Sequence, residues 1–115
     1  MAALGFVMLA GAAHSQPAPL LTYSDIVIEA RRYDKLEFGE RVVSNKVLQK
    51  MAKLDLKQFG GGSPDFYVTK KDEIGFICAK TEAGFKGGTV VAQIVKHEEA
   101  EGGHFYTLNY CSKTK

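Results

Sequence analysis

The residues best suited to chemistry lie in a short acidic stretch between two histidines. His97 and His104 bracket a segment that contains three glutamates. If the flanking segments 89–97 and 104–111 pair as a β-hairpin, both histidines lie at the same end of the hairpin and face each other. Imidazole and carboxylate groups together are suitable ligands for Zn²⁺, Cu²⁺ or Ni²⁺. The sequence therefore nominates a metal site formed by His97, His104 and Glu99.

The spacing within this stretch excludes one well-known zinc motif. A helical zinc protease carries H-E-x-x-H, but the residue four positions after His97 is Glu101. An acidic hairpin loop that ends in glycine and carries two surface histidines is the plainer interpretation of the same residues. Both interpretations stay open at this level, and no cofactor is predicted.

A row of lysines is the second candidate for binding. The row is Lys46, Lys50, Lys53 and Lys57, at intervals of four, three and four residues, which puts all of them on one face of a helix. Such an anion-binding face suits an anionic lipid, a glycan or a nucleic acid. The alternative is a solvated face whose lysine stems cover an apolar edge. The formal net charge of +2 is too small to predict a nucleic-acid partner.

A catalytic constellation is hard to assemble from this chain. Apart from His14 near the amino terminus, the only histidines are the two beside the acidic stretch. The serines show no G-x-S-x-G nucleophile elbow, and the cysteines form no C-x-x-C redox motif. No catalytic residue is therefore predicted. An enzyme, in the form of a small hydrolase without a recognisable motif, is the less favoured class.

The amino terminus predicts export. Residues 1–13 carry no charge and are mostly apolar, and the small residues Ala13 and Ser15 suit signal-peptidase cleavage before Gln16. The apolar run is shorter than the roughly 20 residues that a bilayer span requires. We therefore predict a signal peptide at 1–15 and a periplasmic or secreted mature chain without a transmembrane span. A buried or interfacial N-terminal helix is the alternative.

The two cysteines agree with an oxidising compartment. Cys78 and Cys111 both follow the predicted cleavage point, and an even number of cysteines in an exported chain predicts a disulfide. Two buried free thiols are the alternative. One geometric conflict stands against the bridge, because the positions of Cys78 and Cys111 in their expected strands point to opposite faces of a sheet. A bulge or a strand end is then needed to bring the sulfurs together.

The elements that position these residues follow from composition and apolar periodicity. The β-branched residues within 25–33 predict a first strand. A helix is expected to begin near Ser44 and to end before Gly60. Its apolar residues recur at intervals of four, four and three, at Val43, Val47, Met51 and Leu54.

Beyond a glycine-rich break at 60–65, the apolar period changes from about 3.6 to two, which predicts strands. These strands lie at 66–71, 74–79, 89–96 and 104–111, and we expect them to pair in sequence order as a meander. The order β-α-β-β-β-β predicts an α+β fold in which one helix packs on a four- to five-stranded antiparallel sheet. This order resembles the cystatin-like arrangement, a resemblance of architecture that implies no function. We expect an extended lead-in at 16–24 and a single domain at 25–115.

Composition agrees with a small folded binding domain. The 115 residues leave room for one domain, and the hydrophobic content of 45% is typical of globular proteins. We expect a non-enzymatic binding or accessory domain whose partner is a protein or a component of the cell envelope. A metal-binding protein that uses the His97/His104 hairpin is the alternative. Histidine rings within about 5 Å of each other and beside a carboxylate would favour the metal, whereas an exposed apolar patch would favour a protein partner.

Overall fold

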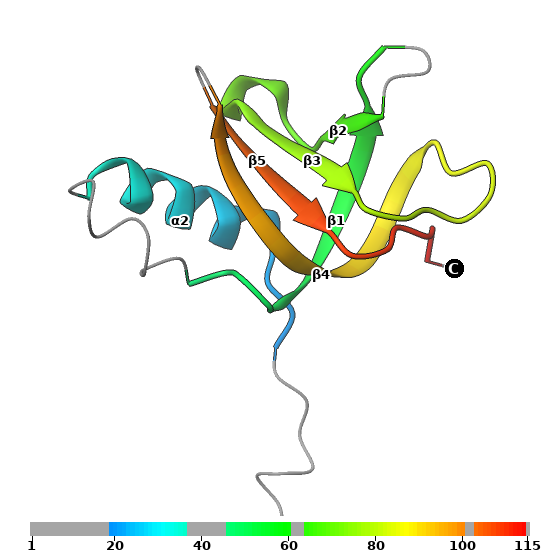
Figure 1. Cartoon of the computed structure of the whole chain (residues 1–115), viewed down its shortest axis with the longest axis horizontal. Helices are drawn as coiled ribbons and strands as arrows, with labels where there is room; N and C mark the ends of the chain where they lie inside the picture. The colour runs from blue at the N-terminus through cyan, green and yellow to red at the C-terminus, as the bar shows by residue number, and fades with distance from the viewer. Residues whose placement is uncertain (1–18, 37–45, 61–63, 101–102, 115) are drawn as a thin grey trace, which may run out of the picture.

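Five strands close into a β-barrel beside a helix in the computed structural model, which describes residues 19–36, 46–60, 64–100 and 103–114 (Figure 1). The elements are α2 (Tyr23–Asp34), β1 (Met51–Gln58), β2 (Asp65–Tyr67), the 3₁₀ turn η2 (Lys70–Asp72), β3 (Ile74–Cys78), β4 (Gly87–Ala100) and β5 (Gly103–Leu108). The predicted helix on an open antiparallel sheet is therefore wrong, and so is the cystatin-like order.

The strand order around the barrel is β1-β2-β3-β5-β4. Strands β3 and β5 run parallel, from the pair Ile74 and His104 to the pair Cys78 and Leu108, and the other neighbouring strands run antiparallel. Strands do lie at the four later predicted positions, but β5 inserts between β3 and β4, so they form no meander. The fold is thus a closed five-stranded barrel with a single parallel pair, an architecture that assigns no function by itself.

The predicted first strand is instead the helix α2. A capping box begins this helix, in which Thr22 Oγ1 accepts a hydrogen bond from the Asp25 backbone N–H and the Asp25 carboxylate accepts one from the Thr22 N–H. The buried residues Ile26, Glu29 and Ala30 follow helical spacing. Burial of this one face and the cap together outweigh the β propensity of the branched residues in the segment.

The predicted helix between 44 and 60 is also wrong, because 51–58 form β1. Ala52, Leu54 and Leu56 are buried, and their neighbours along the strand are exposed. This period of two places the three side chains inside the barrel. The interval of three between Met51 and Leu54 belongs to no helical face, since Met51 lies on the outside of the barrel and Leu54 on the inside.

A disulfide joins Cys78 to Cys111, with a Cα–Cα distance of 5.8 Å, which confirms the predicted bridge. The expected conflict between strand faces does not arise, because β5 already ends at Leu108. Cys111 lies beyond that end, where the backbone forms an isolated bridge with Thr81. The alternation of side chains along β5 therefore does not govern the direction of Cys111.

The predicted signal peptide at 1–15 lies outside the described residues. Within the described ranges, no helix combines the length and the apolarity that crossing a membrane requires.

Candidate functional site

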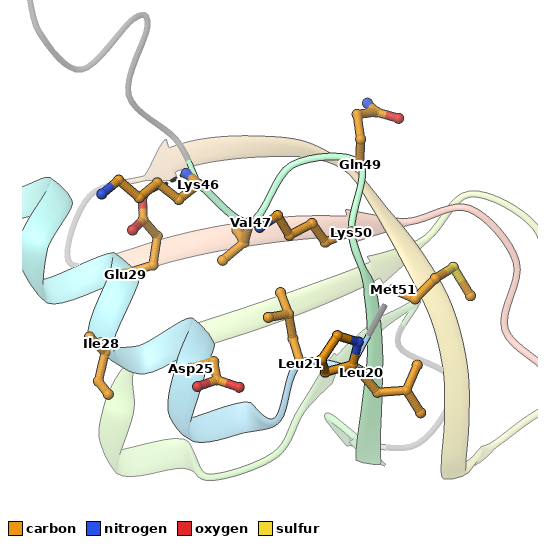
Figure 2. Close-up of a pocket in the computed structure, with 11 residues that line it drawn as sticks. Leu20, Leu21, Asp25, Ile28, Glu29, Lys46, Val47, Gln49, Lys50 and Met51 are labelled. Atoms are coloured by element: carbon orange, nitrogen blue, oxygen red, sulfur yellow. Dashed lines mark hydrogen bonds between the residues drawn. The ribbon is translucent and has the colours of Figure 1, made fainter. Parts of the chain in front are cut away.

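The predicted lysine row is divided between two places, because its residues do not form a helix. Lys53 and Lys57 point outward from β1 on either side of Asp55, and Lys57 Nζ lies 3.4 Å from an Asp55 carboxylate oxygen. Lys46 and Lys50 precede β1 and line an apolar pocket beside α2 (Figure 2). The four lysines therefore do not share the face of one helix, on which the predicted anion-binding row depended.

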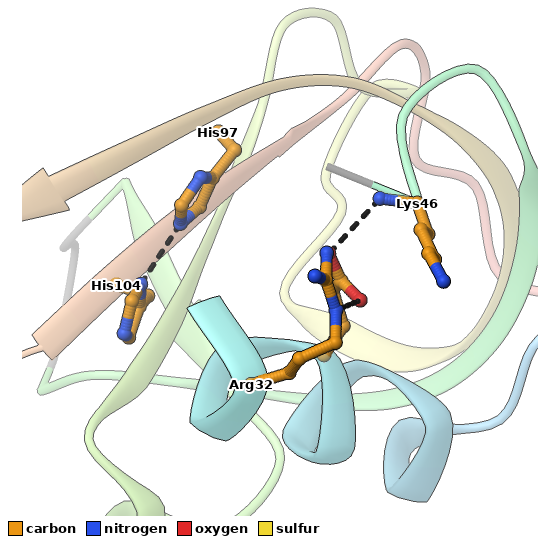
Figure 3. A network of polar contacts seen from close by, with 5 residues as sticks. Arg32, Lys46, His97 and His104 are labelled. Atoms are coloured by element: carbon orange, nitrogen blue, oxygen red, sulfur yellow. Dashed lines mark hydrogen bonds and ion pairs between the residues drawn. The ribbon is translucent and has the colours of Figure 1, made fainter. Parts of the chain in front are cut away.

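The two histidines nominated by the sequence face each other across neighbouring strands (Figure 3). Their ring centroids are 5.0 Å apart, and the distance from His97 Nε2 to His104 Nδ1 is 2.8 Å. His97 lies opposite Tyr106 in the β4–β5 register, and His104 lies opposite Glu99. The contact between the two rings is thus diagonal across the hairpin, within the reach of long and aromatic side chains.

A bulge in β4 directs His97 toward the other histidine. The register with β5 shifts by one residue between Ile94 and Lys96. Ile94 is fully buried, so regular alternation would also turn Lys96 inward. Because the bulge adds one residue, His97 instead takes the position opposite the buried Tyr106. The inward direction of this imidazole therefore depends on a local irregularity of the strand.

His104 has a polar partner at each ring nitrogen although its exposed fraction is only 4%. Nδ1 faces His97, and Nε2 lies 2.9 Å from Oδ1 of Asp34, the last residue of α2. The sequence did not indicate Asp34, because it precedes His104 by 70 residues and lies just beyond the strand predicted at 25–33. Only the packing of the end of α2 against the β4–β5 hairpin reveals this contact.

Asp34, Glu99 and His104 form a set of potential metal ligands. One ligand atom from each residue lies within 4.8 Å of the other two. Both carboxylates are exposed and so can adjust their positions, whereas the buried imidazole is held in place. Zinc sites place such donors about 2.0–2.2 Å from the ion, so only a short approach of the carboxylates is needed. Of the predicted ligands, Glu99 and His104 belong to this set and His97 does not.

His97 is the hydrogen-bond partner of His104, and its surroundings favour the neutral form of its imidazole. Burial lowers the pKa of His97 below its ordinary value, and the charge of His104 lowers it further, although the Glu99 carboxylate acts in the opposite direction. A neutral imidazole donates or accepts at Nε2 according to its tautomer. His97 can therefore accept a hydrogen bond from Nδ1 of His104 when Nε2 of His104 binds an ion.

Aromatic rings hold the two imidazoles in position. The Tyr33 ring meets the His97 ring edge-on at a centroid distance of 4.6 Å, and the Tyr106 ring stacks on the same His97 ring, also at 4.6 Å. Such contacts restrict the rotation of both aromatic partners. The imidazole that contacts His104 is thus preorganised by its neighbours in α2 and β5.

A polar hollow of about 240 Å³ opens over the set of potential ligands. It lies where three distant segments meet, namely the end of α2, the turn before β3 and the β4–β5 hairpin. Its wall consists of Arg31, Asp34, Asp72, Glu73, Glu99, Gly103 and His104. Four carboxylates accompany a single guanidinium, which itself lies 3.9 Å from Asp72. The charge of the wall therefore favours a cation.

Comparison with other proteins adds no assignment to this geometry. The interpretation of the site depends on the contacts of His104 and its neighbours. The chain matches no family model, no curated protein and no solved structure.

Proposed function

We propose that this chain is a non-enzymatic metal-binding domain that holds a divalent transition-metal ion, such as Zn²⁺, with His104, Asp34 and Glu99. The observation that carries the proposal is the buried imidazole of His104, which faces His97 at Nδ1 and the Asp34 carboxylate at Nε2. One imidazole and two carboxylates supply three protein ligands, and water completes a tetrahedral site.

The contact between His104 Nδ1 and His97 favours a metal site over a simple ion pair between His104 and Asp34. An imidazole that binds a metal usually donates its remaining ring N–H to a fixed acceptor, which orients the ring and increases its basicity. His97 Nε2 lies 2.8 Å from Nδ1 of His104 and can serve as this acceptor in the tautomer that leaves Nε2 without a proton. A divalent metal ion is therefore the ligand that we propose for the predicted binding domain.

The proposed setting is the periplasm or the extracellular space. The disulfide between Cys78 and Cys111 supports this setting, since such bridges persist in oxidising compartments. Binding is preferred over catalysis because the sequence carries no nucleophile motif. The signal peptide at 1–15 stays a prediction, and it would provide the export that this setting requires.

The carboxylate ligands can be tested without disturbing the buried histidine. We expect the purified protein to bind Zn²⁺ with a stoichiometry of one in isothermal titration calorimetry. The double variant Asp34→Asn/Glu99→Gln is expected to bind Zn²⁺ more than about a hundredfold less tightly, because loss of an outer-shell partner alone costs about 10–100-fold.

Glu98, the residue before Glu99, provides a control for this titration. Glu98 is exposed, and its carboxylate lies 3.3 Å from Lys96 Nζ on the surface, so Glu98→Gln removes one glutamate charge from the same strand without touching His104. This variant should bind Zn²⁺ like the wild type. Equal affinities for the wild type and the Asp34→Asn/Glu99→Gln variant, or the absence of saturable binding to the wild type, would refute the proposed site.

His97 is expected to act as a positioning residue. His97→Phe keeps the aromatic stacking on Tyr106 but removes the acceptor for Nδ1 of His104. We expect Zn²⁺ affinity to fall about 10–100-fold. The visible spectrum of the Co²⁺-loaded protein should also change in this variant, because the orientation and basicity of the His104 ligand change. An unchanged affinity and spectrum would show that His97 has no part in positioning the ligand.

A further inference from the structure

A second pocket, of about 680 Å³, lies between α2 and the residues that lead into β1. It shares no residue with the polar hollow at His104. Figure 2 shows Ile28 on α2 at one side of this pocket, and Leu20 and Met51 at another. Leu21 and Val47 add further apolar surface. Its volume lies within the range of about 300–1,000 Å³ that small-molecule sites have.

Exposed apolar side chains gather at this pocket. Leu20, Ile28 and Met51 are exposed by 43%, 66% and 42%, and each of them lines it. They are three of the five large hydrophobic side chains that are exposed in the described part of the chain. An exposed apolar cluster of this kind, with polar residues around it, is typical of a binding site.

The charges at the pocket favour an anion. The Asp25 carboxylate belongs to the capping box of α2, and the Glu29 carboxylate accepts hydrogen bonds from Arg32 and from the Lys46 backbone N–H. Both carboxylates therefore have hydrogen-bond donors within the protein, and Arg32 balances the charge of Glu29. The ammonium groups of Lys46 and Lys50 form no direct ion pair with any residue that the structure describes, although the charge of Lys46 acts on the Glu29 carboxylate, which Arg32 already pairs with. Two cationic groups thus stay available to a bound molecule.

The backbone at the pocket is also constrained. Gln49, one of its lining residues, has a φ of 69°, in the left-handed region that favours glycine. Its N–H donates a 2.6 Å hydrogen bond to the Ile94 carbonyl, and its own carbonyl accepts one from Gln93 Nε2. Residues held in sparsely populated conformations cluster at ligand sites. The barrel thus fixes the turn that carries Lys46 and Lys50.

We propose that this pocket binds a small amphipathic anion, a molecule with an unbranched hydrocarbon chain and a carboxylate head. The hydrocarbon chain would cover the apolar side chains Leu20, Ile28 and Met51, whose burial supplies the affinity. The head would form ion pairs with Lys46 and Lys50, which selects anionic over cationic amphiphiles. This second site is independent of the proposed metal site, because the two share no residue.

The probe for this proposal is decanoate, used below its micellar concentration. We expect saturable binding to the wild type in calorimetry, and amide shifts in ¹⁵N NMR confined to α2 and the start of β1. Lys46→Ala/Lys50→Ala should weaken decanoate binding about tenfold or more. The Lys46 backbone N–H that bonds to Glu29 is kept in this variant. Ile28→Ser, at a side chain exposed by 66%, should also weaken binding without affecting the core.

A matched control uses the other two lysines of the row. Lys53→Ala/Lys57→Ala removes the same charge from the outer face of β1 and should leave decanoate affinity unchanged. Decyltrimethylammonium, a cation with the same hydrocarbon chain, should bind at least tenfold more weakly than decanoate. Equal binding of the two amphiphiles, an equal loss in both lysine variants, or no saturable binding of decanoate would each overturn the proposal. The Asp34→Asn/Glu99→Gln variant should bind decanoate normally, so this test is separate from that of the metal site.

Discussion

Replacing Cys78 and Cys111 together by alanine is expected to lower the free energy of unfolding by about 3–4 kcal/mol. The disulfide closes a loop with a sequence separation of 33, which restricts the unfolded chain. The disulfide also joins the end of β3 to the residues that follow β5. These two strands are parallel neighbours, which a short hairpin turn cannot connect. Urea unfolding of the variant and of the wild type, followed by circular dichroism, measures the difference.

The redox state supplies the control for this prediction. Adding a reductant to the wild type should reproduce the loss seen in the double alanine variant, whereas the variant itself should not respond. Cys111 is fully buried, so a small additional loss from the missing sulfur is expected in the variant alone. Unchanged unfolding midpoints in both experiments would show that the bridge does not contribute to stability.

The identity of the first two elements could not be predicted from their composition. The segment that forms α2 is rich in β-branched residues, and the segment that forms β1 follows helical intervals in part, so each pattern predicts the wrong element. In both cases the decisive signal was weaker but local. The capping box of Thr22 and Asp25 marks the start of the helix, and the alternation of Ala52, Leu54 and Leu56 marks the strand.

The closure of the barrel also lies beyond what periodicity can predict. A period of two indicates that a segment is a strand, but it does not say which strands are neighbours. The parallel pairing of β3 with β5 joins segments with the whole of β4 between them in the sequence. The order of strands around the barrel is therefore a tertiary property, and a meander was the simplest expectation.

The candidate metal site was predictable in part. His97 and His104 meet because a hairpin brings the ends of its strands together, which their sequence separation of 7 already indicated. Two features were not accessible. The bulge that directs His97 inward has no clear sequence signal, and Asp34 arrives from a helix that the sequence did not predict. The set of potential ligands consequently differs from the predicted one by exchange of His97 for Asp34.

Replacing Glu29 by glutamine is expected to lower the free energy of unfolding at neutral pH by about 2 kcal/mol. Glu29 is 5% exposed and links α2 to the chain before β1. Its carboxylate accepts hydrogen bonds of 3.0 and 2.7 Å from Arg32 and one of 2.9 Å from the Lys46 backbone N–H. Glutamine has nearly the same shape but loses the charge that strengthens all three bonds.

The same substitution should change how stability depends on pH. Burial by itself would raise the pKa of Glu29, but the hydrogen bonds from Arg32 and Lys46, aided by their positive charges, outweigh burial and lower the pKa below its ordinary value. The stabilisation is therefore complete above the pKa of about 4.3 that an unfolded glutamate has, and it is lost as the pH falls through the lower folded value. Chemical unfolding between pH 7 and pH 3 should show a smaller acid loss in Glu29→Gln than in the wild type. The control is Glu98→Gln, which removes an exposed carboxylate with a surface partner and should retain the wild-type pH profile. A flattened profile in Glu98→Gln, or a wild-type profile in Glu29→Gln, would contradict the role assigned to the buried carboxylate.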